Sequence, residues 1–230
     1  MGLEYARQLA ARGYDLVLVS NRPEELREAS AQLSAAFPVK VLTRFQDLSE
    51  PSSADDLFAW CTSAGILPDI LVNNAGMFFF KELGAGDLDR IQAMLNLHVS
   101  TITRLSILFG SEMKKRGSGY ILIVSSMAAR LPVPGITLYS ATKAFLRSFG
   151  KSLSYEMKPY GVSVTTVCPA AIATPLYRLS PKLMDLGVKL RIIHTPEWLV
   201  RRALRAMFRH RRVVSPSFMN VWLPFLIAIL

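Results

Sequence analysis

Tyr139 and Lys143 are the residues whose types and spacing first suggest chemistry. They lie four positions apart in a segment, 137–158, whose pattern predicts a helix, so they share one helix face. A phenol with a pKa near ~10 exchanges protons poorly at neutral pH, and an adjacent ammonium stabilises the phenolate and lowers that pKa. The pair therefore predicts a general acid or base, although a half-buried tyrosine and a solvated lysine would show the same spacing.

Two serines, Ser125 and Ser126, end the apolar run 119–124, which predicts a buried strand. The end of this strand and the start of the following helix should meet at one edge of a sheet. A hydroxyl would then lie beside the phenol and the ammonium. Such a hydroxyl can donate a hydrogen bond to an oxygen that gains negative charge during a reaction.

Apolar runs alternate with helical patterns along the whole chain. Strands are expected at 15–19, 39–45, 70–72, 120–124, 162–167 and 213–214, and helices at 2–12, from Pro23 onward, 55–64, 87–116, 137–158 and 197–210. This alternation is typical of βαβ units in a parallel sheet with helices on both faces. The sequence thus predicts an α/β, Rossmann-like, doubly wound fold in a single domain over 1–214, followed by an apolar tail over 215–230.

A second motif, Asn73-Asn74-Ala75-Gly76, follows the apolar run 70–72, and Ser126 precedes Tyr139 by thirteen positions. Together with Tyr-x-x-x-Lys, and in this order, these residues resemble the classical type of the short-chain dehydrogenase/reductase family. The resemblance runs from Gly2 to about Thr174. It implies an NAD(P)-dependent oxidoreductase that moves hydride between a nicotinamide and a carbonyl or alcohol, without a metal.

The resemblance also implies roles for the catalytic residues. Tyr139 would be the general acid and base, Ser126 would hydrogen-bond the substrate oxygen, and Lys143 would lower the pKa of Tyr139 and hold the nicotinamide ribose. Asn96 matches the family residue that holds a water behind the lysine, although it could equally be an ordinary polar residue of a long helix. The thirteen-residue spacing selects Ser126 over Ser125. His98 and His194 match no motif and are expected to be structural or surface residues.

Further positions match the family's cofactor contacts. Gly2 matches the last glycine of the turn that faces the pyrophosphate. The second strand ends in Ser20-Asn21-Arg22 without an acid, which favours NADP(H) over NAD(H), because a guanidinium suits a 2′-phosphate; the alternative is that Arg22 is only a solvated charge. The remaining matches are Asp47, Leu48, Asn73, Ala75, Gly76, Tyr139, Lys143, Pro169, Ile172 and Thr174.

The family's first strand and the two earlier glycines of its turn do not precede Gly2. That strand would be the central one of the sheet, and its two neighbours would be left with unpaired N–H and C=O groups that cost about 1–3 kcal/mol each. We therefore expect a chain that is incomplete at its N-terminus, and expect residues 1–230 alone to have low stability.

Apolar residues in the segment that corresponds to the substrate lid, about 175–195, and in Met77–Phe80 favour a hydrophobic carbonyl substrate. A 3-oxoacyl thioester or a steroid-like ketone would fit. Lid residues that only pack on the body of the protein would explain the pattern as well.

The net charge is +10, and between Arg178 and Arg212 ten Lys and Arg residues face only Asp185 and Glu197. This region and the apolar tail could rest on an anionic membrane surface or cover a partner subunit, since the apolar run 218–230 is too short to span a bilayer. Nucleic-acid binding is not expected, because the basic residues are not interleaved with aromatic ones. We expect a homo-oligomer that is cytoplasmic or membrane-peripheral, with buried Cys61 and Cys168 reduced. The alternative function is a non-catalytic fragment of this fold that binds a partner or a membrane surface.

Overall fold

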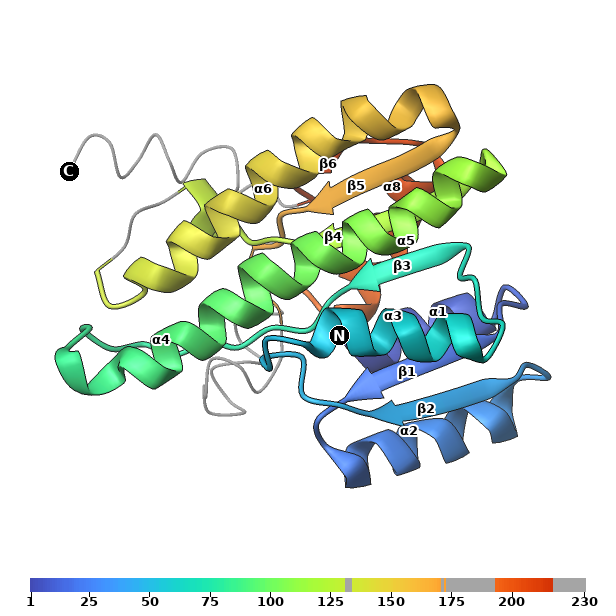
Figure 1. The fold of residues 1–230 in the computed structure, drawn as a ribbon, viewed down its shortest axis with the longest axis horizontal. Helices are drawn as coiled ribbons and strands as arrows, with labels where there is room; N and C mark the ends of the chain where they lie inside the picture. The colour runs from blue at the N-terminus through green and yellow to red at the C-terminus, as the bar shows by residue number, and fades with distance from the viewer. Residues whose placement is uncertain (131–133, 171, 173–192, 217–230) are drawn as a thin grey trace.

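The strands of the protein form two parallel sheets. The computed structural model describes residues 1–130, 134–170, 172 and 193–216. One sheet pairs β1 (Leu16–Ser20) with β2 (Val41–Phe45). The other has the order β3-β4-β5-β6, with β3 (Ile70–Asn73), β4 (Gly119–Val124), β5 (Val162–Val167) and β6 (Val213–Val214) (Figure 1). Parallel strands with helices on both sides confirm the predicted α/β, Rossmann-like fold.

The two sheets meet at a break between β1 and β3. Within the described part of the chain, β1 pairs only with β2 and β3 only with β4, so their facing edges have no strand partner. This is the place where the sequence predicts an absent central strand. One hydrophobic core nevertheless joins the sheets, since Leu16 of β1 packs in the same cluster as Leu122 of β4 and Val167 of β5. The expected low stability of residues 1–230 stays a prediction, which a thermal melt would test.

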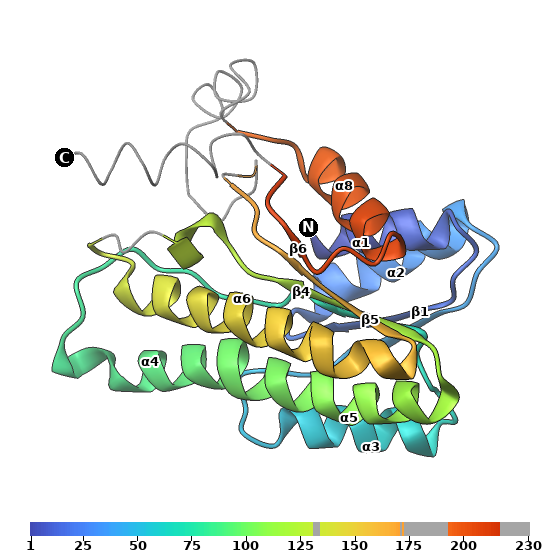
Figure 2. The same cartoon turned by 90° about the horizontal axis from the view of Figure 1, so that it is seen from above.

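Helices cover both faces of the strands. The helices of one layer are α1 (Gly2–Ala10), α2 (Pro23–Ala36) and α8 (Pro196–Phe208). The helices of the other layer are α3 (Ser53–Ser63), α4 (Leu88–Leu95), α5 (Ile102–Arg116) and α6 (Thr137–Met157). Figure 2 shows the strands between these two layers.

The sequence explains where several elements begin and end. Pro23 opens α2 at a position where a helix needs no N–H donor, and Glu24 and Glu25 lie at the positive end of its dipole. Gly117 ends α5 in the left-handed conformation, with φ 73°. All residues of β5 are buried, as expected for a parallel strand that is covered on both faces.

The predicted single helix over 87–116 is interrupted by a π-helical turn, Asn96–Thr101, which separates α4 from α5. A π turn places an extra residue in the helix, so the side chains that follow it are rotated from their regular 3.6-residue positions. Regular helical periodicity therefore does not give the faces of the residues in this turn. Asn96 and His98 are two such residues.

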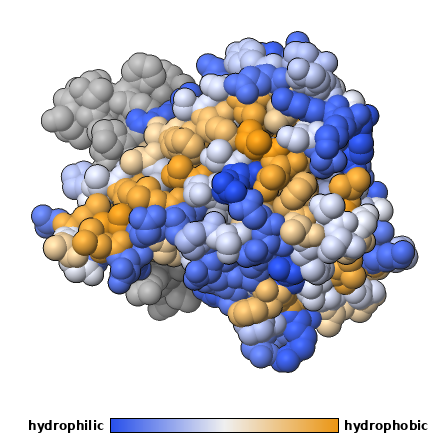
Figure 3. Space-filling view, viewed as in Figure 1, coloured by the Kyte–Doolittle hydropathy of each residue, from blue (hydrophilic) through white to orange (hydrophobic). Residues whose placement is uncertain are grey.

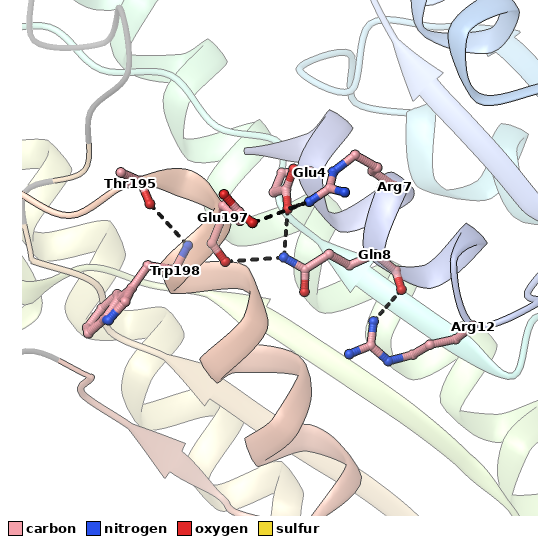
Figure 4. Close-up of polar contacts among 7 residues, drawn as sticks. All are labelled: Glu4, Arg7, Gln8, Arg12, Thr195, Glu197 and Trp198. Atoms are coloured by element: carbon pink, nitrogen blue, oxygen red, sulfur yellow. Dashed lines mark hydrogen bonds and ion pairs between the residues drawn. The ribbon is translucent and has the colours of Figure 1, made fainter. Parts of the chain in front are cut away.

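The N-terminal helix packs against the last helix of the described chain. Gln8 Nε2 donates to the backbone oxygen of Glu197 at 3.2 Å, and Arg7 forms an ion pair with the Glu197 carboxylate at 3.9 Å (Figure 4). The α8 N-cap is Thr195, whose hydroxyl accepts a hydrogen bond from the Trp198 N–H at 3.2 Å. The contacts of Gln8 and Arg7 with Glu197 fix α1, and thereby Gly2 at its start, relative to α8.

Both cysteines, Cys61 and Cys168, are buried thiols, as expected for core residues. Among the described helices none has both the length and the apolar character that a bilayer crossing requires.

Close packing of α6 on the sheet leads to a first prediction. A methyl group at Gly150 would overlap the Thr166 hydroxyl oxygen and lie 3.1 Å from Ile123 Cδ1. We expect Gly150→Ala to lower the free energy of unfolding by about 1–3 kcal/mol, because α6 would have to move off β5. The control is Gly86→Ala, where nothing lies within 4 Å of the added methyl. Equal chemical denaturation midpoints for the two variants would contradict this account of the packing.

Candidate active site

Lys143 is buried where β4 ends. Only 4% of the residue is exposed to solvent. Its Nζ donates a hydrogen bond to the backbone oxygen of Val124 at 3.0 Å. The same Nζ lies 5.6 Å from the centre of the Tyr139 ring. The predicted pair therefore shares one face of α6, and that face is turned toward the end of a central strand.

The two serines after β4 have different partners. Ser125 Oγ donates to the backbone oxygen of Lys143 at 2.7 Å, which ties the strand end to α6. Ser126 Oγ accepts a hydrogen bond from the Ala128 N–H at 3.1 Å and keeps its own proton available for another acceptor. This difference agrees with the choice of Ser126 over Ser125 as the reactive hydroxyl.

Burial controls the charge of Lys143. Desolvation lowers its pKa from 10.5 to about 8, and the nearby Cys168 thiol opposes this shift. A lysine with a pKa near neutrality can exchange a proton at physiological pH more readily than an exposed lysine can.

The loop after β3 lies between α1 and α6. Asn73 is buried and donates from Nδ2 to Ser106 Oγ at 3.0 Å, which anchors the strand end to α5. A Cβ at Gly2 would lie 3.1 Å from Asn74 Nδ2, and a Cβ at Gly76 would lie 3.7 Å from Lys143 Nζ. The predicted cofactor residues Gly2 and Asn73–Gly76 are thus brought together, on the same side as Lys143.

The loops after β1 and β2 contact one another. Asn21 Nδ2 donates to Asp47 Oδ2 at 2.9 Å, while Asp47 Oδ1 accepts from the Ser49 N–H at 2.8 Å. These hydrogen bonds, with that of the Ser49 hydroxyl first, lower the pKa of Asp47. Leu48 offers its backbone oxygen to Thr101 Oγ1 at 2.9 Å. Asp47 and Leu48 therefore hold a rigid turn at the strand ends.

Arg22 is exposed and forms an ion pair with Glu25 at 2.6 Å between Nη1 and Oε1. This pair joins the N-cap residue of α2 to its first turn. In this state the guanidinium is a solvated charge beside the strand end, and both expectations for Arg22 remain open.

Asn96 is not brought to the other predicted catalytic residues. Its Nδ2 donates to the backbone oxygen of Ser49 at 3.0 Å, and its Oδ1 accepts from Gln92 Nε2 at 2.8 Å. Both polar ends of the side chain are therefore used at the loop after β2. Its role behind Lys143 stays a prediction without a supporting contact.

His98 is the residue that the sequence reasoning missed. It is fully buried, and its ring lies 5.9 Å from the Tyr139 ring, centre to centre. Regular helical spacing gives no signal for it, because the π-helical turn departs from the 3.6-residue periodicity. By contrast, His194 is half-buried and stacks on Trp198 at 3.9 Å.

The remaining predicted positions lie near the end of β5. Pro169 is buried, and its backbone oxygen accepts from the Met127 N–H at 2.7 Å, next to Ser126. Ile172 is buried, and its backbone pairs with that of His194 in an isolated parallel β-bridge. Thr174 and the part of the predicted lid up to residue 192 lie outside the described residues, as does the tail from 217.

Comparisons with known proteins agree with this geometry. A family model described as short chain dehydrogenase matches residues 1–182. A very-long-chain 3-oxoacyl-CoA reductase of Rattus norvegicus is 36% identical over 191 residues, which are 80% of this chain and 60% of that protein. The chain spans between 59% and 65% of the length of the curated relatives compared.

Two solved structures are similar over nearly the whole chain. A short-chain dehydrogenase from Sphingobium yanoikuyae in complex with NADPH has a TM-score of 0.81 and 28% identity, covering 99% of this chain and 88% of that one. A bulky-bulky ketone specific alcohol dehydrogenase from Comamonas testosteroni has a TM-score of 0.82 and 25% identity, with the same coverage.

The buried ammonium of Lys143 leads to a second prediction. Because the folded chain holds this proton less tightly than the unfolded chain, the free energy of unfolding should rise with pH between about 8 and 10.5. The shift corresponds to roughly 3 kcal/mol, at about 1.36 kcal/mol per pKa unit. We expect Lys143→Met to remove most of this rise, measured by urea unfolding between pH 7 and 9.5.

The matched control is Lys151→Met, which removes an exposed lysine from the same helix. That variant should keep the pH dependence of the parent. If Lys143→Met also keeps it, the ammonium is not desolvated in the folded protein.

Proposed function

Because the chain belongs to the short-chain dehydrogenase family, a family of NAD(P)-dependent oxidoreductases, we propose that it is an NADPH-dependent reductase of hydrophobic carbonyl compounds. The observation that carries the proposal is the buried Lys143 ammonium at the end of β4, on the helix face that also bears Tyr139. The match of residues 1–182 and the similarity to 3-oxoacyl-CoA reductases support it.

The loop after β3 supports a dinucleotide at the start of α1. Asn74 Oδ1 is buried without a hydrogen-bond partner, which is unfavourable unless a further donor meets it. Gly2 and Gly76 leave room where side chains would meet Asn74 and His98. Gly2 and the Asn73–Gly76 loop would hold the cofactor on one side, with Lys143 and Tyr139 on the other. When bound, the reduced nicotinamide supplies the hydride.

Residues of the chain supply the proton that the substrate oxygen needs. Negative charge develops on the substrate oxygen as hydride reaches the carbonyl carbon, and Tyr139 gives its phenolic proton to that oxygen. Ser126 donates a second hydrogen bond to the same atom. The ammonium of Lys143 stabilises the phenolate that remains on Tyr139, and this stabilisation is strong because the site is poorly solvated. In the oxidation direction the same groups act in reverse.

The proposed substrate class is the 3-oxoacyl thioester. The curated relatives named very-long-chain 3-oxoacyl-CoA reductase support it. Phe78 adds an apolar wall, since its ring meets the Tyr139 ring edge to face at 5.0 Å. The ketone specificity in the name of the Comamonas testosteroni structure keeps a steroid-like ketone as the second candidate within the same reaction.

Two surfaces support partners beyond the substrate. Figure 3 shows apolar side chains over the helices that face the viewer, and the exposed ones on α4, α5 and α6 include Leu88, Ile107 and Phe145. We propose a homo-oligomer that covers them. Exposed Arg201 and Arg205 on α8, with Arg209 at its C-cap, support peripheral contact with an anionic membrane surface. A cytoplasmic or membrane-peripheral location stays a prediction.

Replacement of the proposed proton donor is the third prediction. Tyr139→Phe should lower kcat for a 3-oxoacyl thioester with NADPH by about 10²–10⁴-fold, because no phenol remains to protonate the oxygen. NADPH affinity should stay within about threefold, since the ring remains in place. The matched control is Tyr155→Phe, which removes an exposed hydroxyl from the same helix and should retain full turnover. A Tyr139→Phe rate within about tenfold of the parent would exclude the role.

Cofactor preference is the fourth prediction. NADPH should bind more tightly than NADH, and Arg22→Ala should reduce that difference by about 1–3 kcal/mol through loss of charge-assisted hydrogen bonds to the 2′-phosphate. Arg27→Ala is the control, because Arg27 lies on the same helix and also pairs with a glutamate, Glu24. If both variants keep the parent's ratio of dissociation constants, Arg22 is only a surface charge.

A further inference from the structure

His98 occupies the centre of the site without a role in the proposed reaction. The π-helical turn Asn96–Thr101 directs its ring between the loop after β3 and the first turns of α6. Its Nε2 lies 3.0 Å from the Met77 backbone nitrogen, and its Nδ1 lies 2.9 Å from Thr142 Oγ1. A fully buried imidazole with partners on both nitrogens holds one orientation.

The partners also determine which ring nitrogen carries the proton. A backbone N–H can only donate, so Nε2 must be the acceptor for Met77. Nδ1 therefore carries the proton and donates it to Thr142 Oγ1, which in turn donates to the backbone oxygen of Tyr139 at 2.9 Å. All three hydrogen bonds run in one direction, from the loop after β3 to the backbone of Tyr139.

The same imidazole limits how the loop approaches Lys143. A Cβ at Gly76 would lie 3.0 Å from His98 Nε2 and 3.7 Å from Lys143 Nζ. The Cβ side of the Gly76 backbone thus faces both the imidazole and the ammonium. If the bond from Met77 to His98 were lost, this part of the loop would be free to move away from Lys143.

The imidazole must be neutral for this arrangement. Burial, followed by the positive charge of Lys143, holds the pKa of His98 far below its ordinary value. Two ionisable groups of α6 act on it: the Tyr139 ring lies against it and Lys143 places a positive charge beside it, while Cys168, after β5, lies near Lys143. A protonated ring would place a second cation beside the ammonium and an N–H against the Met77 N–H.

We infer that His98 is a positioning residue: a neutral imidazole that fastens the loop 74–77 to the start of α6 and so fixes the distance between the dinucleotide side of the site and the Tyr139–Lys143 pair. The inference rests on the proposed function, because a reductase needs these two sides in a fixed relation. Asn96 braces the loop after β2 from the same turn, through its bond to Ser49. The π turn therefore supports both loops.

The first test needs no cofactor or turnover. In ¹⁵N spectra of the histidine side chains of the full chain, the His98 signals are identified by their loss in His98→Gln, since the chain has three histidines. We expect the neutral form with the proton on Nδ1, unchanged between pH 5.5 and 8.5. A proton on Nε2, or titration within that range, would overturn the inference.

The second test separates positioning from general stability by rescue. In His98→Gln the amide oxygen can still accept from the Met77 N–H, whereas His98→Leu fills the space without a hydrogen bond. We expect His98→Leu to bind NADPH about tenfold more weakly and to lower kcat at saturating substrate, and His98→Gln to recover NADPH affinity to within about threefold of the parent. His210→Gln, at an exposed histidine, is the control and should match the parent.

Equal NADPH affinity for His98→Leu and the parent would overturn the positioning role, as would a failure of His98→Gln to recover it. A parent protein that binds NADPH but turns over no 3-oxoacyl thioester would refute the proposed substrate and leave the affinity test of His98 intact. A parent that binds no NADPH would refute the proposed function. The ¹⁵N measurement alone would then decide whether a neutral His98 fastens the loop 74–77 to α6.

Discussion

The buried ammonium of Lys143 is the constraint on which the rest of the site depends. A charged lysine inside a protein is unfavourable unless polar groups replace the water that it loses. Here the backbone oxygen of Val124, the last residue of β4, does so. The close packing of α6 at Gly150 and the bond from Ser125 to the Lys143 backbone hold the helix where this contact forms. The packing of α6 on the sheet thus determines which face of the helix is turned toward the site.

The two sides of the proposed site stand on different sheets. Tyr139, Lys143 and Ser126 belong to helices and loops of the β3–β6 sheet, whereas Arg22 and Asp47 follow the strands of the β1–β2 sheet. No strand in the described chain joins these sheets, so side-chain contacts must fix the position of one sheet relative to the other. The contacts from Asn96 to Ser49 and from Thr101 to Leu48 make this connection from the π turn. The turn therefore bridges a break in the backbone hydrogen bonding.

Much of this arrangement could be predicted from the sequence, because it depends on local patterns. The buried strands, the start of α2 at Pro23 and the shared face of Tyr139 and Lys143 follow from composition and helical spacing. The π turn could not be predicted in this way, since it departs from regular periodicity, and neither the side-chain contacts of Asn96 nor the burial of His98 follows from regular helical spacing. The ion pair of Arg22 with Glu25 depends on side-chain conformation, which no motif specifies.

The central claim is that Lys143 and Tyr139 ionise as a coupled pair, and ultraviolet titration of the phenolate tests it most directly. The spectrum of the parent minus that of Tyr139→Phe isolates one of the seven tyrosines. The same difference is then measured between Lys143→Met and the double variant Lys143→Met/Tyr139→Phe. The account predicts that the Tyr139 phenolate forms at a lower pH when Lys143 is present, with a titration that belongs to the pair. Identical midpoints with and without Lys143 would contradict it.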